Sequence, residues 1–219
     1  MNRKNRTLCN GLIALLLFAV WTVLVQTVDV QPAGETGKTV GFATANSWFH
    51  QLTGIHLQLY AITDWLGLVP VFVCLLFGLL GLKQLICRKS LLKVDPDLIL
   101  LGIYYVLVIA GYFIFEMHPI NYRPIFIDGR LEASYPSSTT LLVLSVMPTL
   151  VFQTDRRARR PEVKRAVRIL TMLFSVTMVM GRLVSGVHWM TDIVGSVLMS
   201  HGLFSIYQAS VLFCDGKEV

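Results

Sequence analysis

The chain has 219 residues, of which 54% are hydrophobic and only 15% are charged. A soluble domain usually carries about a quarter charged residues, so this composition excludes an ordinary soluble protein. The formal charge of +6 could indicate nucleic-acid binding in a soluble chain, but here the basic residues lie between apolar runs. They therefore indicate membrane topology and no nucleic-acid partner.

Several apolar runs approach the roughly 20 residues that a helix needs to cross about 30 Å of hydrocarbon. The predicted spans are 10–29, 65–83, 97–115, Ser137 to Gln153, 166–185 and Trp189 to Phe213. The first run follows basic residues, as a signal peptide does, but it is long for one and lacks a small-x-small cleavage site, so we expect a retained helix. The pattern predicts an all-α polytopic membrane protein, a six-transmembrane-helix bundle in which residues 1–219 form one domain.

Between the first two predicted spans, residues 40–64 mix aromatic and aliphatic side chains such as Trp48, Leu52 and Tyr60 with polar ones. This mixture fits a short amphipathic helix at the membrane interface, or equally an ordered surface loop.

Lysine and arginine decide the orientation, because loops rich in them stay in the cytoplasm. All but four of the 19 lie before the first span, between spans two and three, between four and five, or after the sixth, at Lys217. Both termini are therefore expected in the cytoplasm, with the chain in the inner membrane. The same orientation places three polar segments, 116–124, 135–140 and 181–192, on the extracytoplasmic side.

The third of these segments contains His188 and Asp192, four residues apart, which share a helix face if a helix begins near His188. A carboxylate bonded to one imidazole nitrogen fixes the tautomer and makes the other nitrogen more nucleophilic. Arg182 precedes them at the end of a span, and ionisable groups at membrane depth are usually functional. The alternative is a structural ion pair between Arg182 and Asp192.

The other two segments supply groups that suit a bound anion. Ser137, Ser138 and Thr139 stand where the fourth span begins, and the free N–H groups of a helix start attract anions, although such hydroxyls are often simply caps. Arg123 lies in the first segment, and the planar guanidinium suits phosphate, although it could also anchor the chain at the interface.

Several other residues have plainer interpretations. The four cysteines, Cys9, Cys74, Cys87 and Cys214, form no CxxC pair, so neither a structural disulfide nor a metal site is expected. His50, His56 and His201 are expected at the interface or in packing. Arg130 and Glu132 are expected at a solvated rim, with a pairing of Arg130 with Glu116 or a contact of Arg130 with a lipid headgroup as the alternative.

Together the three segments resemble the signature of the type 2 phosphatidic acid phosphatase superfamily, which reads Lys-x6-Arg-Pro, Pro-Ser-Gly-His and Ser-Arg-x5-His-x3-Asp. Arg123-Pro124 matches the first motif, Pro136-Ser137 half of the second, and Arg182, His188 and Asp192 nearly all of the third. The resemblance covers roughly residues 100–200.

The resemblance implies a lipid phosphatase that needs no metal or other cofactor and acts on a phosphorylated lipid at the outer face of the membrane. His188 would attack phosphorus and form a phosphohistidine, with Asp192 orienting it. Arg123, Arg182, Ser137 and backbone N–H groups near Ser138 and Thr139 would hold the phosphoryl oxygens. Water would then release phosphate.

This chain departs from the pattern at four positions: Glu116 replaces the lysine, Ser138 the glycine, Thr139 the general-acid histidine, and Gly181 the serine. Three explanations are open. A pyrophosphate substrate, such as a polyprenyl pyrophosphate, expels a phosphate that needs no proton. Glu116 or His118 could instead serve as the general acid, because a neighbouring phosphate raises a carboxyl pKa. Alternatively, hydrolysis is lost and the protein binds or transports a lipid phosphate.

Overall fold

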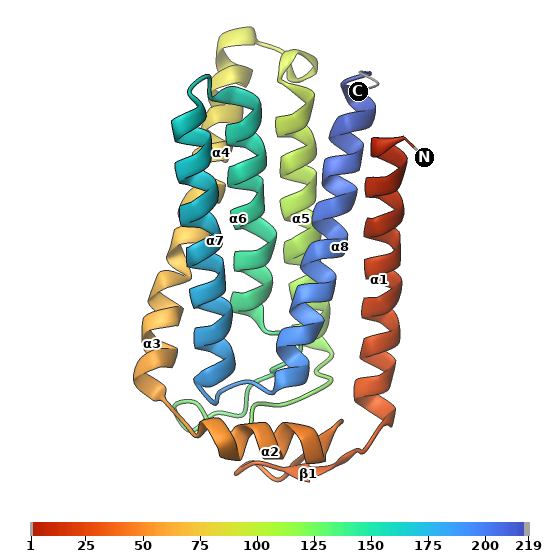
Figure 1. Ribbon diagram of the computed structural model, residues 1–219, viewed down its shortest axis with the longest axis vertical. Coiled ribbons are helices and arrows are strands. Elements are labelled where there is room, and N and C mark those ends of the chain that lie inside the picture. The colour runs from red at the N-terminus through yellow and green to blue at the C-terminus, as the bar shows by residue number, and fades with distance from the viewer. Residues whose placement is uncertain (1, 217–219) are drawn as a thin grey trace.

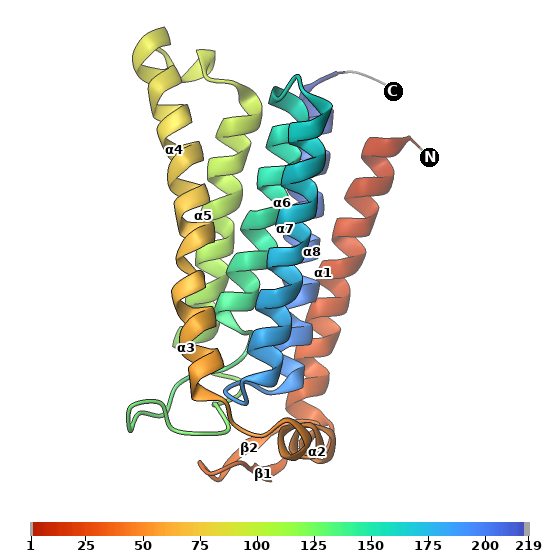
Figure 2. The ribbon, with the colours of Figure 1, turned by 60° about the vertical axis from the view of Figure 1, so that its left-hand side comes forward.

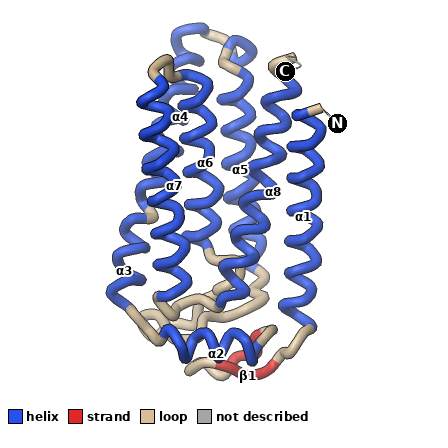
Figure 3. Tube along the Cα trace, viewed as in Figure 1, coloured by secondary structure: helices blue, strands red, loops and turns tan. Residues whose placement is uncertain are grey.

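The computed structural model describes residues 2–216 and consists mainly of long helices standing side by side, with one short helix across an end (Figure 1). A tube coloured by secondary structure shows a single small hairpin at that end (Figure 3). In chain order the elements are α1 (Arg3–Thr27), β1 (Gln31–Ala33), β2 (Lys38–Val40), α2 (Ala43–Thr53), α3 (Leu57–Leu66), α4 (Leu68–Arg88), the 3₁₀ turn Leu91–Lys93, α5 (Pro96–Met117), α6 (Ser138–Arg157), α7 (Pro161–Val184) and α8 (Met190–Cys214).

The bundle has two chemically different ends. The start of α1 and the end of α8 lie at one end with the α4–α5 and α6–α7 turns, and we call this the terminal end (Figure 2). The hairpin β1–β2, helix α2, the loop 118–137 and the α7–α8 turn lie at the other, the hairpin end. The predicted basic segments therefore gather at the terminal end, except Lys217, which lies outside the described residues. The three polar segments gather at the hairpin end.

Within the described residues, five helical stretches are long and apolar enough to cross a membrane, namely α1, α3 with α4, α5, α7 and α8. These stretches identify a multi-pass membrane protein. Helix α6 covers the predicted fourth span but is less apolar, because it contains several serines and threonines and a glutamine. Most of these polar side chains are buried inside the bundle.

Three tyrosines form hydrogen bonds with polar groups of α6 inside the bundle. The Tyr104 hydroxyl donates to the backbone oxygen of Ser145 at 2.8 Å, and the Tyr105 and Thr149 hydroxyls lie 2.7 Å apart. The amide nitrogen of the α6 glutamine likewise donates to the Tyr207 hydroxyl at 2.6 Å. Since lipid offers no hydrogen bonds, such partners let a polar helix run through the middle of a membrane protein.

The segment 40–64 differs from its prediction. It forms one short helix, α2, across the hairpin end, but residues from Leu57 onward belong to α3, which runs into α4 with a break at Gly67. The predicted start of the second span at 65 is therefore wrong by eight residues. The mixed polar and apolar pattern suggested a helix at the interface, but one side of α3 packs on α7. The sequence alone does not show this packing. Helix α1 also begins earlier than predicted, at Arg3.

Helices α1 and α8 approach closely through glycines. A Cβ atom at Gly202 would lie 2.8 Å from the Leu15 Cγ atom, and one at Gly11 would lie 3.0 Å from the Gly202 carbonyl oxygen. No side chain fits between the two backbones, so these glycines set the distance between the first and last helices.

Gly202→Ala should lower the melting temperature of the purified protein, because the added methyl group overlaps Leu15 and overpacking typically costs about 1–3 kcal/mol. Gly78→Ala is the matched control, since a Cβ there would meet nothing within 4 Å. We expect the control to melt at the wild-type temperature or above it. Equal melting temperatures for all three proteins would contradict the close packing.

Candidate active site

The predicted histidine lies in the turn between α7 and α8, and the predicted carboxylate lies beside it in the first turn of α8. His188 is 3% exposed, Asp192 is fully buried, and the Asp192 Oδ2 atom lies 3.7 Å from His188 Nδ1. Asp192 also accepts hydrogen bonds from the Trp189 backbone N–H at 2.9 Å and from the Asn121 side-chain amide at 3.1 Å. The carboxylate therefore fixes the start of α8 and faces the imidazole at once.

Burial lowers the pKa of His188 to about 4, against the opposing effect of the Asp192 carboxylate, and the Arg123 guanidinium lowers it further. The imidazole is therefore neutral near pH 7. Neither ring nitrogen has a hydrogen-bond partner among the described residues. A neutral, unpartnered imidazole is available as a nucleophile.

Arg182 is 1% exposed at the end of α7, and its Nη2 atom donates to Asp64 Oδ1 at 2.8 Å and to the Thr139 hydroxyl. The alternative of an Arg182–Asp192 ion pair is therefore wrong, because the partner carboxylate comes from α3. The Arg182 Nε and Nη1 atoms are buried without a partner within residues 2–216.

Arg123 comes from the loop before α6 and is 7% exposed. Its Nη2 atom lies 3.1 Å from Glu132 Oε2, while Nε and Nη1 have no partner in the described part of the chain. The guanidinium carbons of Arg123 and Arg182 lie 5.6 and 4.8 Å from the centre of the same ring, that of Tyr60. Two arginines from distant parts of the sequence thus meet over one tyrosine.

A mainly polar cavity of about 200 Å³ opens beside these groups. Its lining includes His188, Arg123, Ser138, Glu116 and Glu132. Glu132, expected at a solvated rim, has a side chain that is 38% exposed and pairs with Arg123 on the cavity wall.

A neighbouring cavity of about 320 Å³ shares Ser138 with the first. Asp64 and Thr139 line it together with apolar side chains that include Leu68 and Ile109. The polar site therefore adjoins a pocket with an apolar wall.

The start of α6 behaves differently at each predicted position. Ser137 is fully buried, and its hydroxyl donates to Thr140 at 3.1 Å, so this proton is committed within the protein. Ser138 lines the cavity, and the Thr139 hydroxyl accepts from Arg182. His118 is exposed where α5 ends and is not among the residues that line the cavity, whereas Glu116 is.

Sequence reasoning missed Tyr60, Asp64 and Asn121. The sequence did contain a signal for two of them: Asp64 is a charged residue just before an apolar run, and Tyr60 lies one helical turn before it. Among the described residues, no group of three or more His, Cys, Asp or Glu side chains is arranged to hold a metal ion.

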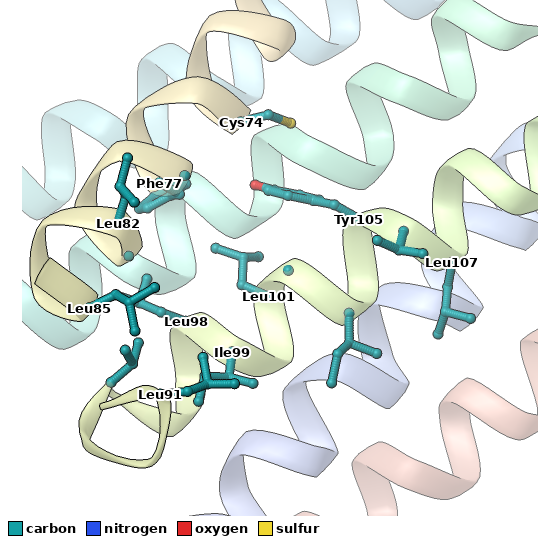
Figure 4. A pocket seen from close by; sticks show the side chains of 16 residues that line it. Cys74, Phe77, Leu82, Leu85, Leu91, Leu98, Ile99, Leu101, Tyr105 and Leu107 are labelled. Carbon is teal, nitrogen blue, oxygen red and sulfur yellow. The ribbon is translucent and has the colours of Figure 1, made fainter. Parts of the chain in front are cut away.

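A third cavity, of about 540 Å³, lies between α4 and α5 toward the terminal end (Figure 4). Its walls are apolar side chains such as Phe77, Leu82, Leu98 and Leu101, and no charged residue is among them. This groove can accept hydrocarbon, and among the described residues that line it the only side-chain polar groups are the Cys74 thiol and the Tyr105 hydroxyl.

A sequence model described as the PAP2 superfamily matches residues 96–212, more than half of the chain. The structure is similar to the crystal structure of a transmembrane PAP2-type phosphatidylglycerolphosphate phosphatase from Bacillus subtilis, with a TM-score of 0.66 and 17% sequence identity. The match covers 95% of this chain and 98% of that one, and at this identity it shows a shared fold. No curated protein matches the chain at a significant level.

His188 should make stability depend on pH. Its pKa falls from the ordinary 6.5 to about 4 on folding, so between these values the unfolded chain binds more protons and acidification destabilises the folded protein. A His188→Gln variant lacks this titration. We therefore expect the melting temperature of the wild type, relative to the variant, to fall as the pH is lowered from 7 to 5. Parallel curves for the two proteins would contradict the lowered pKa.

Proposed function

Because the chain belongs to the PAP2 superfamily, we propose that it is a membrane lipid phosphatase that hydrolyses a phosphorylated or pyrophosphorylated lipid. The observation that carries the proposal is the convergence of the neutral His188 imidazole with the free N–H groups of Arg123 and Arg182. Donors of this kind, buried and unpartnered, suit the oxygens of a phosphoryl group.

We propose that the bundle crosses the inner membrane six times, with α6 as the crossing that is less apolar than the other five. The basic segments at the terminal end support a cytoplasmic location for both termini. The hairpin end, with the cavity that His188 lines, would then face the extracytoplasmic side, where it can meet lipid headgroups of the outer leaflet.

In the proposed mechanism, His188 Nδ1 faces Asp192, which leaves Nε2 to attack phosphorus. The N–P bond forms as the bond from phosphorus to the leaving-group oxygen breaks, and Asp192 stabilises the imidazolium character that develops. Arg123 and Arg182 hold the phosphoryl oxygens as charge shifts among them. Water then cleaves the phosphohistidine, releases phosphate and restores the neutral imidazole.

The leaving group decides which lipid suits this site. The Thr139 hydroxyl, which accepts a hydrogen bond from Arg182, cannot supply a proton near neutral pH. A pyrophosphate substrate expels a lipid phosphate, which is a far better leaving group than an alkoxide, so we favour a polyprenyl pyrophosphate. For a monophosphate, Glu116 is the better-placed acid, because it lines the cavity and His118 does not.

A second candidate is a relative that binds or transports a lipid phosphate without hydrolysing it. The acidic side chains beside the arginines favour it, since Asp64, Glu116 and Glu132 make the surroundings less attractive to a dianion than the family lysine would. Turnover by the unmodified protein separates the two functions.

The purified protein should release inorganic phosphate from a lipid pyrophosphate in detergent, and His188→Ala should abolish this release because it removes the attacking nitrogen. His201→Ala is the matched control, since this histidine is exposed on α8 and lies outside the cavity. Unchanged release by His188→Ala would refute the assigned nucleophile. No release by the wild type from any lipid phosphate would favour the non-catalytic function.

Thr139→His should raise hydrolysis of a lipid monophosphate at least tenfold, because general acid catalysis typically contributes about 10²–10⁴-fold. Hydrolysis of a lipid pyrophosphate should change much less, since its leaving group needs no proton. The ratio of the two rates, measured on the same preparation, checks the explanation. An equal change for both substrates would count against it.

A further inference from the structure

Helix α3 contributes two side chains to the site, although it lies outside the matched residues 96–212. Tyr60 and Asp64 are four residues apart, so they share one face of α3. The Tyr60 ring lies against the guanidinium groups of Arg123 and Arg182, and Asp64 accepts from Arg182 Nη2 at 2.8 Å. Both arginines of the proposed phosphate site are therefore held from α3.

The close seating of α3 explains a departure from the family pattern. A Cβ atom at Gly181 would lie 2.6 Å from the Thr63 Cγ2 atom, so a serine there would force the Thr63 side chain or α3 to shift. Gly181 directly precedes Arg182, and Thr63 directly precedes Asp64. The missing side chain at 181 thus permits the approach that brings the Asp64 carboxylate to the arginine.

The second departure fits the same arrangement. Thr139 stands where the family has a histidine, and its hydroxyl meets the same Nη2 atom of Arg182 that Asp64 meets. The two acceptors fix one nitrogen of a side chain that is 1% exposed, and the Nε and Nη1 atoms remain without partners in the described chain. A buried guanidinium held at one nitrogen keeps its other donors in a fixed direction.

We propose that Asp64 is a positioning residue of the active site, which holds Arg182 so that its free N–H groups meet the phosphoryl oxygens. This inference rests on the proposed function and adds to it a residue that the three sequence motifs do not contain. Asp64 acts through Arg182, and the Asp64 side chain is itself 60% exposed and lines the cavity that adjoins the phosphate site. Loss of the carboxylate should therefore disturb the arginine more than the fold.

The test compares Asp64→Ala with Asp64→Asn, because an amide oxygen can still accept from Arg182 whereas a methyl group cannot. Asp64→Ala should lower kcat about 10- to 100-fold, as expected when a phosphate-holding group is misplaced. Asp64→Asn should recover at least half of the wild-type kcat. Asp155→Ala is the control, since it breaks an exposed ion pair with Arg168 at the terminal end and should leave kcat unchanged.

The affinity for inorganic phosphate, measured by calorimetry on the same detergent-solubilised proteins, tests the position of the Arg182 guanidinium without requiring turnover. We expect Asp64→Ala to bind phosphate about tenfold more weakly than the wild type and Asp64→Asn to bind within threefold of it. If Asp64 merely repels the anion, both variants will bind phosphate more tightly, and the proposal is overturned. If the wild type binds phosphate but hydrolyses no lipid, only the proposed function is refuted. The phosphate affinities of the wild type and the two Asp64 variants still test the role of Asp64.

Discussion

Arg123, Arg182 and His188 bury side-chain nitrogens that have no hydrogen-bond partner within the described residues. A buried polar group without a partner costs about 1–3 kcal/mol, and more when it is charged. The surrounding structure holds these groups in place nonetheless: Asp64, Thr139 and Glu132 each engage one arginine nitrogen, the Tyr60 ring packs on both guanidinium groups, and Asp192 faces the imidazole. A bound anion would satisfy the donors that remain, and for this reason the arrangement indicates an anion-binding site.

The carboxylates around the site shape what it can do. Each arginine has one acidic partner, so part of its charge is already balanced before any substrate arrives. The paired nitrogens are thereby fixed in direction, while the free ones are left for the ligand.

Much of the architecture could be predicted from the sequence, because apolar runs and basic loops respond directly to the bilayer. The helices and their grouping at two ends follow from patterns local to short segments. The meeting of Arg123, Arg182 and His188 with Asp192 was expected because their segments share one side of the membrane and resemble the motifs of the family. Asp64 and Asn121 could not be found this way, since their partners lie 118 and 71 residues away and depend on how helices pack. The hydrogen bond from the Ser137 hydroxyl to Thr140 could not be predicted either, because a position before a helix start does not show where the hydroxyl proton points.

The most direct measurement is an experimental structure of the protein with orthovanadate, which mimics the five-coordinate phosphorus of the transition state. We expect vanadium bonded to the Nε2 atom of His188, with vanadate oxygens within hydrogen-bond distance of the guanidinium groups of Arg123 and Arg182. Vanadate bound away from that ring, or a ring whose Nε2 atom is occupied by another protein group, would contradict it.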